Sequence, residues 1–177
     1  LDLLNQWPDP NPPEYWVEKM TAIARDEVEH LAIVTRLLAR RGGRLTKHHK
    51  NSYANELRTH VRVGQGPRET MDRLMISALI EARSCERFEL LSRNCEDREL
   101  SRLYAGLWAS ERGHFLSFLD LARQLPERDP ARSAKIVEER WQEWLDVEAS
   151  IIAAQPPGPR IHSGMQNEEC RMQKEQA

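Results

Sequence analysis

Two short motifs in this sequence place a glutamate and a histidine three positions apart. They are EVEH, from Glu27 to His30, and ERGH, from Glu111 to His114. Residues three apart share one face of a helix, so each motif can present a carboxylate and an imidazole to the same metal ion. With 28 acidic residues and 6 histidines in 177 residues, such pairs also arise by chance. The residues around each motif must therefore show whether it faces the core.

Both motifs fill gaps in apolar stripes that recur at helical spacing. The stripe around Glu27 and His30 consists of Trp16, Met20, Ile23, Val34 and Leu37. The stripe around Glu111 and His114 consists of Leu103, Tyr104, Leu107, Phe115 and Phe118. The pattern predicts that both motifs lie on the core face of long helices.

A third carboxylate, Glu81, interrupts an apolar stripe in the same way, among Leu74, Ala78, Cys85 and Phe88. A register error of one turn would put Glu86 in its place. Three carboxylates in one apolar interior would each cost several kcal/mol unless a proton or a cation neutralises them. A mixed set of carboxylates and imidazoles suits iron or manganese better than zinc. The predicted metal ligands are Glu27, His30, Glu81, Glu111 and His114.

The apolar periodicity predicts four long helices, at about residues 14–41, 67–93, 97–124 and 131–154, and a short helix near 52–63 within a crossover at 43–66. Two helices with such motifs and two helices that each give one glutamate make the ferritin-like di-metal pattern. The expected fold is an all-α, ferritin-like bundle with a crossover connection and an extra C-terminal helix. We expect one domain over residues 1–164 and a polar, disordered tail over 165–177.

The ferritin-like pattern calls for a fourth glutamate, yet no glutamate precedes Glu14. Residues 1–7 have the composition of the last turns of a helix whose beginning is absent. Two explanations remain: the ligand-bearing turns lie upstream of residue 1, or the site is depleted. We favour a truncated first helix.

Composition agrees with a helical protein that functions in the cytoplasm. Hydrophobic residues make up 40% and charged residues 31%, with only 8 glycines. Three cysteines at wide spacing favour reduced thiols over a disulfide framework. No apolar run approaches the roughly 20 residues that cross a bilayer, and no signal-peptide pattern is present. We therefore expect a soluble, cytoplasmic protein.

Basic residues are concentrated between positions 36 and 68, where nine lysines and arginines accompany one acid. Such a segment can bind the phosphates of a folded RNA. The alternative is a solvated helix end and loop, which is common for runs of charge. The candidates for RNA contact are Arg40, Arg41, Arg44, Lys47 and Lys50.

The block IEARSCERF at residues 80–88, with SERGH at 110–114 and RIHSG at 160–164, resembles the MiaE family of tRNA 2-methylthio-N6-isopentenyladenosine hydroxylases. The resemblance runs from the first residues to about Gly164. It implies an oxygen-dependent di-iron monooxygenase that hydroxylates the isopentenyl side chain of the modified adenosine next to the anticodon. Glu27 and Glu111 would bridge the two irons and be the catalytic pair, His30 and His114 would take one iron each, and Glu81 would be a terminal ligand.

The implied partners are tRNA, dioxygen and a separate reductase, because the sequence has no GxGxxG nucleotide fingerprint of its own. Two other classes of protein remain possible from the residues alone. One is a ferritin- or rubrerythrin-like protein that stores iron or scavenges peroxide. The other is a helical scaffold without metal.

Overall fold

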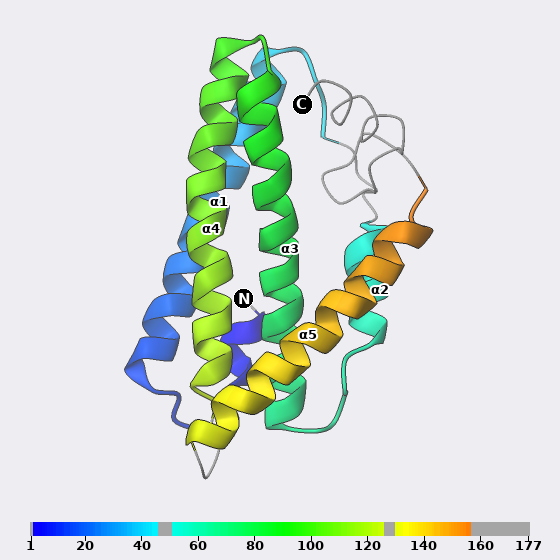
Figure 1. Ribbon diagram of the computed structural model, residues 1–177. Coiled ribbons are helices and arrows are strands. Elements are labelled where there is room, and N and C mark those ends of the chain that lie inside the picture. Colours follow the sequence, from blue (N-terminus) through cyan, green and yellow to red (C-terminus); the bar gives the residue numbers. More distant parts are fainter. Residues whose placement is uncertain (1, 46–50, 126–129, 157–177) are drawn as a thin grey trace.

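A computed structural model describes residues 2–45, 51–125 and 130–156 of the chain. Within these ranges it contains helices and no strand, which confirms the all-α prediction (Figure 1). The elements are η1 (Asp2–Gln6), α1 (Glu14–Arg40), α2 (Ser52–Thr59), α3 (Pro67–Asn94), α4 (Arg98–Arg123) and α5 (Pro130–Ala154). The candidate tail at 165–177, Lys47, Lys50 and the RIHSG motif lie outside the described residues.

The long helices begin and end within two residues of their predicted bounds, and local chemistry explains the ends. The side chain of Asp97 accepts hydrogen bonds from the backbone N–H groups of Glu99 and Leu100 and so caps α4. Pro67 occupies the first turn of α3, where its missing N–H costs nothing. Helix α5 likewise begins at a proline, Pro130, one residue before the predicted start.

Two short elements differ from prediction. The crossover helix α2 ends at Thr59 rather than near residue 63, and Gly64 and Gly66 then adopt positive φ angles as the chain turns toward α3. Residues 2–6 form a 3-10 helix instead of α-helical turns. There the carbonyl of Leu4 accepts a hydrogen bond from the Trp16 indole at 3.0 Å, which anchors η1 to the start of α1.

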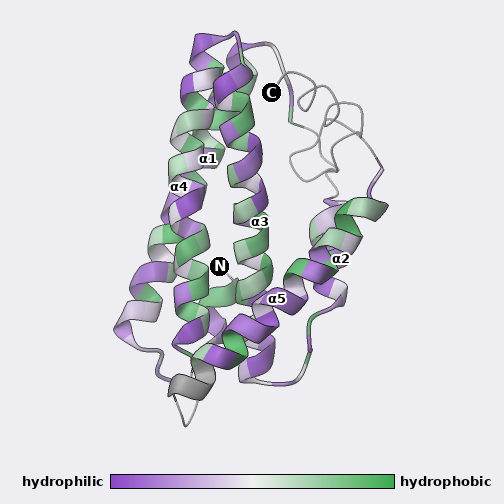
Figure 2. Ribbon diagram, viewed as in Figure 1, coloured by the Kyte–Doolittle hydropathy of each residue, from purple (hydrophilic) through white to green (hydrophobic). Residues whose placement is uncertain are grey.

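Helices α3 and α4 form an antiparallel hairpin, and α1 packs against α4 (Figure 1). Helix α5 crosses the lower part of this bundle and packs against α2, α3 and α4. Apolar residues gather on η1 and on the lower turns of α3 and α4 (Figure 2). The core there includes the fully buried side chains of Trp16, Trp144, Leu74, Met75, Leu79 and Leu121.

Helix α1 is less buried than its sequence predicts. Trp16, Met20 and Ile23 lie in the core, but Val34 is 41% exposed and Leu31 is 62% exposed. The reason is that α1 packs against only α4 and η1 among the described elements. The apolar face that α1 turns away from α4 is therefore open to solvent over the described part of the chain.

Candidate metal centre

Four of the five predicted ligands come together between the three long helices. Glu27 of α1, Glu81 of α3, and Glu111 and His114 of α4 each offer one ligand atom, and these atoms lie within 4.8 Å of one another. The fifth, His30, lies beside them, with its ring centroid 5.9 Å from that of His114. We call these five residues the candidate metal site.

Glu111 lies between the two histidines and faces each through a different oxygen. Its Oε1 is 3.3 Å from Nδ1 of His30, and its Oε2 is 3.3 Å from Nδ1 of His114. Glu27 also faces both rings, with Oε1 at 3.1 Å from Nδ1 of His114 and at 3.7 Å from Nδ1 of His30. The arrangement places two carboxylates between two imidazoles.

Burial of the site is uneven. Glu111 and His114 are buried, and Glu81 and His30 are partly buried. The side chain of Glu27 is 48% exposed, so its predicted place on the core face is wrong. Glu27 lies on the edge of α1 that borders the open side of the bundle, because no described helix covers that face.

The pKa values of three residues in the site are shifted by burial and by their neighbours. Burial, and then the neighbouring Glu111, raises the pKa of Glu81 to about 10. Burial alone would lower the pKa of His114, but its contacts with Glu111, Glu27 and Asp26 raise it to about 10. The pKa of Glu111 is lowered despite its burial, chiefly by His114. Both shifts favour the protonated form, of Glu81 and of His114.

Three buried polar atoms of the site lie beside oppositely charged groups but make no hydrogen bond of acceptable geometry among the described residues. They are Nδ1 of His30, Nδ1 of His114 and Oε2 of Glu111. Buried polar groups are ordinarily satisfied, so orphaned ligand atoms that converge on one point indicate a place for an absent group. Two imidazole nitrogens and carboxylate oxygens are a donor set that fits iron.

The structure places Glu81, not Glu86, toward the other ligands. The side chain of Glu86 is 61% exposed and pairs with Arg83 on the same helix. Five positions separate the two glutamates, which is about 140° around a helix, so they lie on different faces of α3. Among the residues that the structure describes, no fourth glutamate joins the cluster of ligand atoms.

Asp26 was not singled out from the sequence, although it precedes Glu27 directly. Its Oδ2 lies 3.3 Å from Nε2 of His114, on the side of the ring opposite the other ligands. Asp26 could have been found from a general rule: a metal-binding histidine usually donates a hydrogen bond from its second ring nitrogen to a carboxylate, a backbone carbonyl or water.

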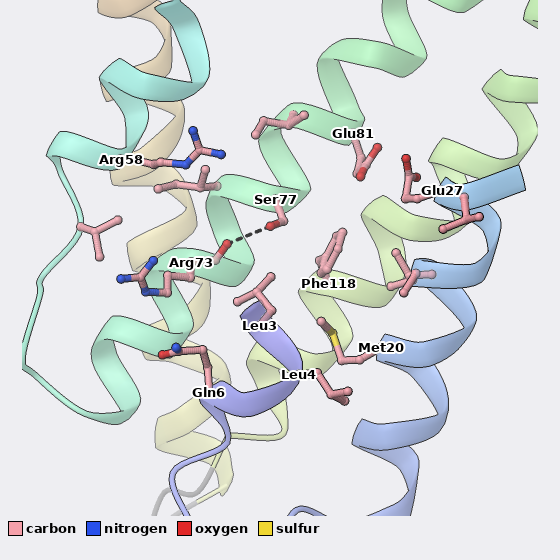
Figure 3. Close-up of a pocket in the computed structure, with 16 residues that line it drawn as sticks. Leu3, Leu4, Gln6, Met20, Glu27, Arg58, Arg73, Ser77, Glu81 and Phe118 are labelled. Carbon is pink, nitrogen blue, oxygen red and sulfur yellow. Dashed lines mark hydrogen bonds between the residues drawn. The ribbon is translucent and has the colours of Figure 1, made fainter. Parts of the chain in front are cut away.

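A cavity of about 480 Å³ opens beside the site, between α1 and α3 (Figure 3). Glu27 and Glu81 lie at one end of it, and Arg58 and Arg73 lie toward the other. Its walls between these ends are mostly apolar, with side chains from η1, α1, α3 and α4: Leu3, Leu4, Met20, Ile23, Ile76, Ile80 and Phe118. The cavity is therefore the open side of the candidate metal site.

Among the basic residues predicted to bind RNA, the two at the end of α1 are paired with acidic residues of α4 and its N-cap. Arg41 pairs with Asp97 at 2.7 Å and with Glu99 at 2.9 Å, and Arg40 also pairs with Glu99. We call these four residues the arginine–acid cluster; it joins the end of α1 to the start of α4. Arg44, just beyond it, is exposed. An RNA role for Arg40, Arg41 and Arg44 stays a prediction.

Comparison with known proteins gives a family for the chain. A family model described as tRNA-(MS2IO6A)-hydroxylase (MiaE) matches residues 10–163. The chain belongs to the MiaE family. The resemblance predicted from the IEARSCERF block is thereby confirmed.

Two MiaE relatives carry the name tRNA 2-(methylsulfanyl)-N(6)-isopentenyladenosine(37) hydroxylase. The one from Pseudomonas putida is 37% identical over 150 residues, which cover 84% of this chain and 69% of the relative. The one from Salmonella typhimurium is 31% identical over 149 residues, and the match spans about half of its length, 52%.

The fold of this MiaE chain is also found in a solved structure. It is similar to protein 43 with aldehyde deformylating oxygenase activity from Synechococcus, with a TM-score of 0.73 and 30% sequence identity. The match covers 84% of this chain and 72% of that one. Within the described part of the MiaE chain, no helix is long and apolar enough to cross a membrane.

Proposed function

We propose that this MiaE-family chain hydroxylates the isopentenyl side chain of 2-methylthio-N6-isopentenyladenosine, next to the anticodon of tRNA. The observation that carries the proposal is the convergence of Glu27, Glu81, Glu111 and His114 in a chain that matches the MiaE family over most of its length. The two relatives named for this hydroxylation support the choice of substrate. A tRNA substrate also favours a cytoplasmic location.

The residues present fit two iron ions. Glu27 and Glu111 would bridge them, because each faces both histidines. His30 and His114 would bind one ion each through Nδ1, and Glu81 would be a terminal carboxylate. Bound iron would supply the activation of dioxygen, a chemistry that protein side chains lack.

The reaction inserts one oxygen atom of dioxygen into a carbon–hydrogen bond, and the other atom leaves as water. Two electrons and two protons are needed, and we propose a separate reductase as the electron donor. The chain's own part is to position the substrate and to exclude water from it. Leu107, one helical turn before Glu111, is buried, and the half-buried Cys85 directs Sγ toward the carbonyl of Trp108 at 3.8 Å. These groups would limit water around the reacting carbon.

The cavity between α1 and α3 gives the site an open approach. Glu27 and Glu81 lie at one end of this cavity, so this is the side from which a substrate would reach them.

The proposed activity is tested by nucleoside analysis of tRNA. Cells that lack the native hydroxylase are complemented with the gene for the full-length protein, and the hydroxylated nucleoside is measured by mass spectrometry. We expect hydroxylation with the unaltered protein and with Glu86→Ala, and none with Glu111→Ala. If the hydroxylated nucleoside is absent from all three strains, the proposed activity is rejected.

A second measurement separates this function from iron storage. Aerobic incubation with ferrous iron, followed by metal analysis, should give no more than two irons per chain. Accumulation well beyond that number would favour the ferritin-like alternative.

A further inference from the structure

Two consecutive residues of α1 hold the imidazole of His114 from opposite sides. Oε1 of Glu27 lies 3.1 Å from Nδ1, and Oδ2 of Asp26 lies 3.3 Å from Nε2. The ring itself is buried, whereas the side chain of Asp26 is 35% exposed. One nitrogen therefore faces the candidate metal site, and the other faces a carboxylate outside it.

The environment of His30 is different. In the described part of the chain, both ion-pair contacts of His30 are made through Nδ1, to Glu27 at 3.7 Å and to Glu111 at 3.3 Å. No carboxylate of the described residues is paired with its Nε2. The two ExxH motifs look equivalent in sequence, but their histidines differ in the second nitrogen.

We propose that Asp26 is a positioning residue that makes the metal position at His114 bind more tightly than the position at His30. The inference rests on the proposed metal centre. A metal ion on Nδ1 requires the proton to be on Nε2, where Asp26 accepts it as a hydrogen bond. An anionic partner at the second nitrogen fixes the ring and makes the first nitrogen a better donor.

The contacts of Asp26 give less support to a purely structural role. Its other charged contact is with the neighbouring Arg25 at 3.5 Å, and the Arg25 side chain is 70% exposed. Exposed ion pairs of this kind contribute little to stability. The contact that distinguishes Asp26 is the one to His114, which crosses from α1 to α4.

The test is an anaerobic calorimetric titration of the full chain with ferrous iron alone. The variants are Asp26→Asn, Asp26→Ala, His30→Ala and His114→Ala, with Glu18→Gln as the matched control. Glu18→Gln removes one negative charge from an exposed position of the same helix. Circular dichroism and thermal unfolding of each variant establish that it is folded.

We expect two unequal binding steps, of which His114→Ala removes the tighter and His30→Ala the weaker. Asp26→Ala should weaken the tighter step by roughly 10- to 100-fold, Asp26→Asn by less, and Glu18→Gln should change neither. If one ion binds per chain, it should survive His30→Ala and be lost in His114→Ala. The proposal is overturned if Asp26→Ala leaves the tighter step unchanged, weakens both steps equally, or if no iron binds.

The titration uses no tRNA, so its outcome is independent of the hydroxylation assay. Unequal iron binding that depends on Asp26 would stand even if tRNA were unmodified. Equal binding steps would overturn the inference while the hydroxylase proposal remained open to its own test.

Discussion

The phenol of Tyr53, on the crossover helix α2, donates a hydrogen bond to the buried carboxylate of Glu148 on α5. Both residues are almost inaccessible to solvent, and Glu148 also lies 3.2 Å from Arg83 of α3. Burial, and then the contact with Glu148, raises the pKa of Tyr53, so the phenol stays protonated as a donor. This contact joins the crossover and the last helix to the hairpin.

We therefore predict that Tyr53→Phe lowers the free energy of unfolding by about 1.5–3 kcal/mol, because a buried charged acceptor loses its donor. Urea denaturation monitored by circular dichroism measures the change. Tyr104→Phe is the matched control, since Tyr104 is half-buried and stacks on Phe88. If both variants lose the same free energy of unfolding, the hydrogen bond from Tyr53 to Glu148 does not contribute the predicted stability.

Asp72 is a fully buried carboxylate that binds two arginines. We therefore predict that the free energy of unfolding depends on pH in the acid range. Burial alone would raise the pKa of Asp72, but hydrogen bonds from Arg62 and Arg140 lower it below its ordinary value. Because the pKa of Asp72 is lowered in the folded state, its contribution to the stability of the protein is complete above the unfolded pKa of about 4. It is lost as the pH falls further, through the folded pKa.

Asp72→Asn should accordingly cost about 3–5 kcal/mol at pH 7, since it leaves two guanidinium groups without their partner. The difference from the unaltered chain should shrink as the pH is lowered below about 4. Denaturant titrations at a series of pH values test this. Asp146→Asn, at an exposed position of α5, should show no such pH-dependent difference.

The two acidic residues Glu81 and Glu86 offer a direct test of the candidate metal site. Glu81→Ala removes a ligand atom of the cluster and should abolish binding of at least one iron per chain. Glu86→Ala removes only a partner of Arg83 and should leave iron binding intact. Metal analysis after anaerobic loading and gel filtration makes the comparison. Intact binding in the Glu81 variant would move the site elsewhere.

Contact with tRNA is expected at the end of α1, where Arg44 is exposed. Arg44→Glu should weaken tRNA binding and reduce the slope of its salt dependence, because a phosphate contact is lost. Filter binding at several salt concentrations measures both quantities. Lys19→Glu, an equal change of charge near the opposite end of α1, is the control. An equal loss in both variants would indicate an effect of net charge rather than a contact.

The long helices and most of the candidate site could be predicted because their signals are local. Apolar spacing fixes the bounds of α1, α3 and α4, and the gaps in those stripes indicate Glu81, Glu111 and His114. The exposure of Leu31 and Val34 could not be predicted in this way. Periodicity shows which face of a helix is apolar but not whether another helix covers it.

Pairings between distant segments account for the remaining differences. Arg41 reads as a free basic residue in sequence, and only the fold brings Asp97 to it. Asp72 likewise gives no sign that Arg140, sixty-eight positions away, will bind it. Such contacts depend on three-dimensional proximity, for which a single sequence has no direct signal.

The arginine–acid cluster lies at equal distances along α1 and α4 from the two metal-binding motifs. Glu27 lies fourteen positions before Arg41, and Glu111 lies fourteen positions after Asp97, so the two antiparallel helices have equal arms of about 21 Å between the cluster and the site. Deleting one residue from either arm would rotate its motif by about 100° about the helix axis. The length of each arm is therefore constrained, and a matching deletion in the other arm would not repair the site, because both motifs would then be rotated away from it.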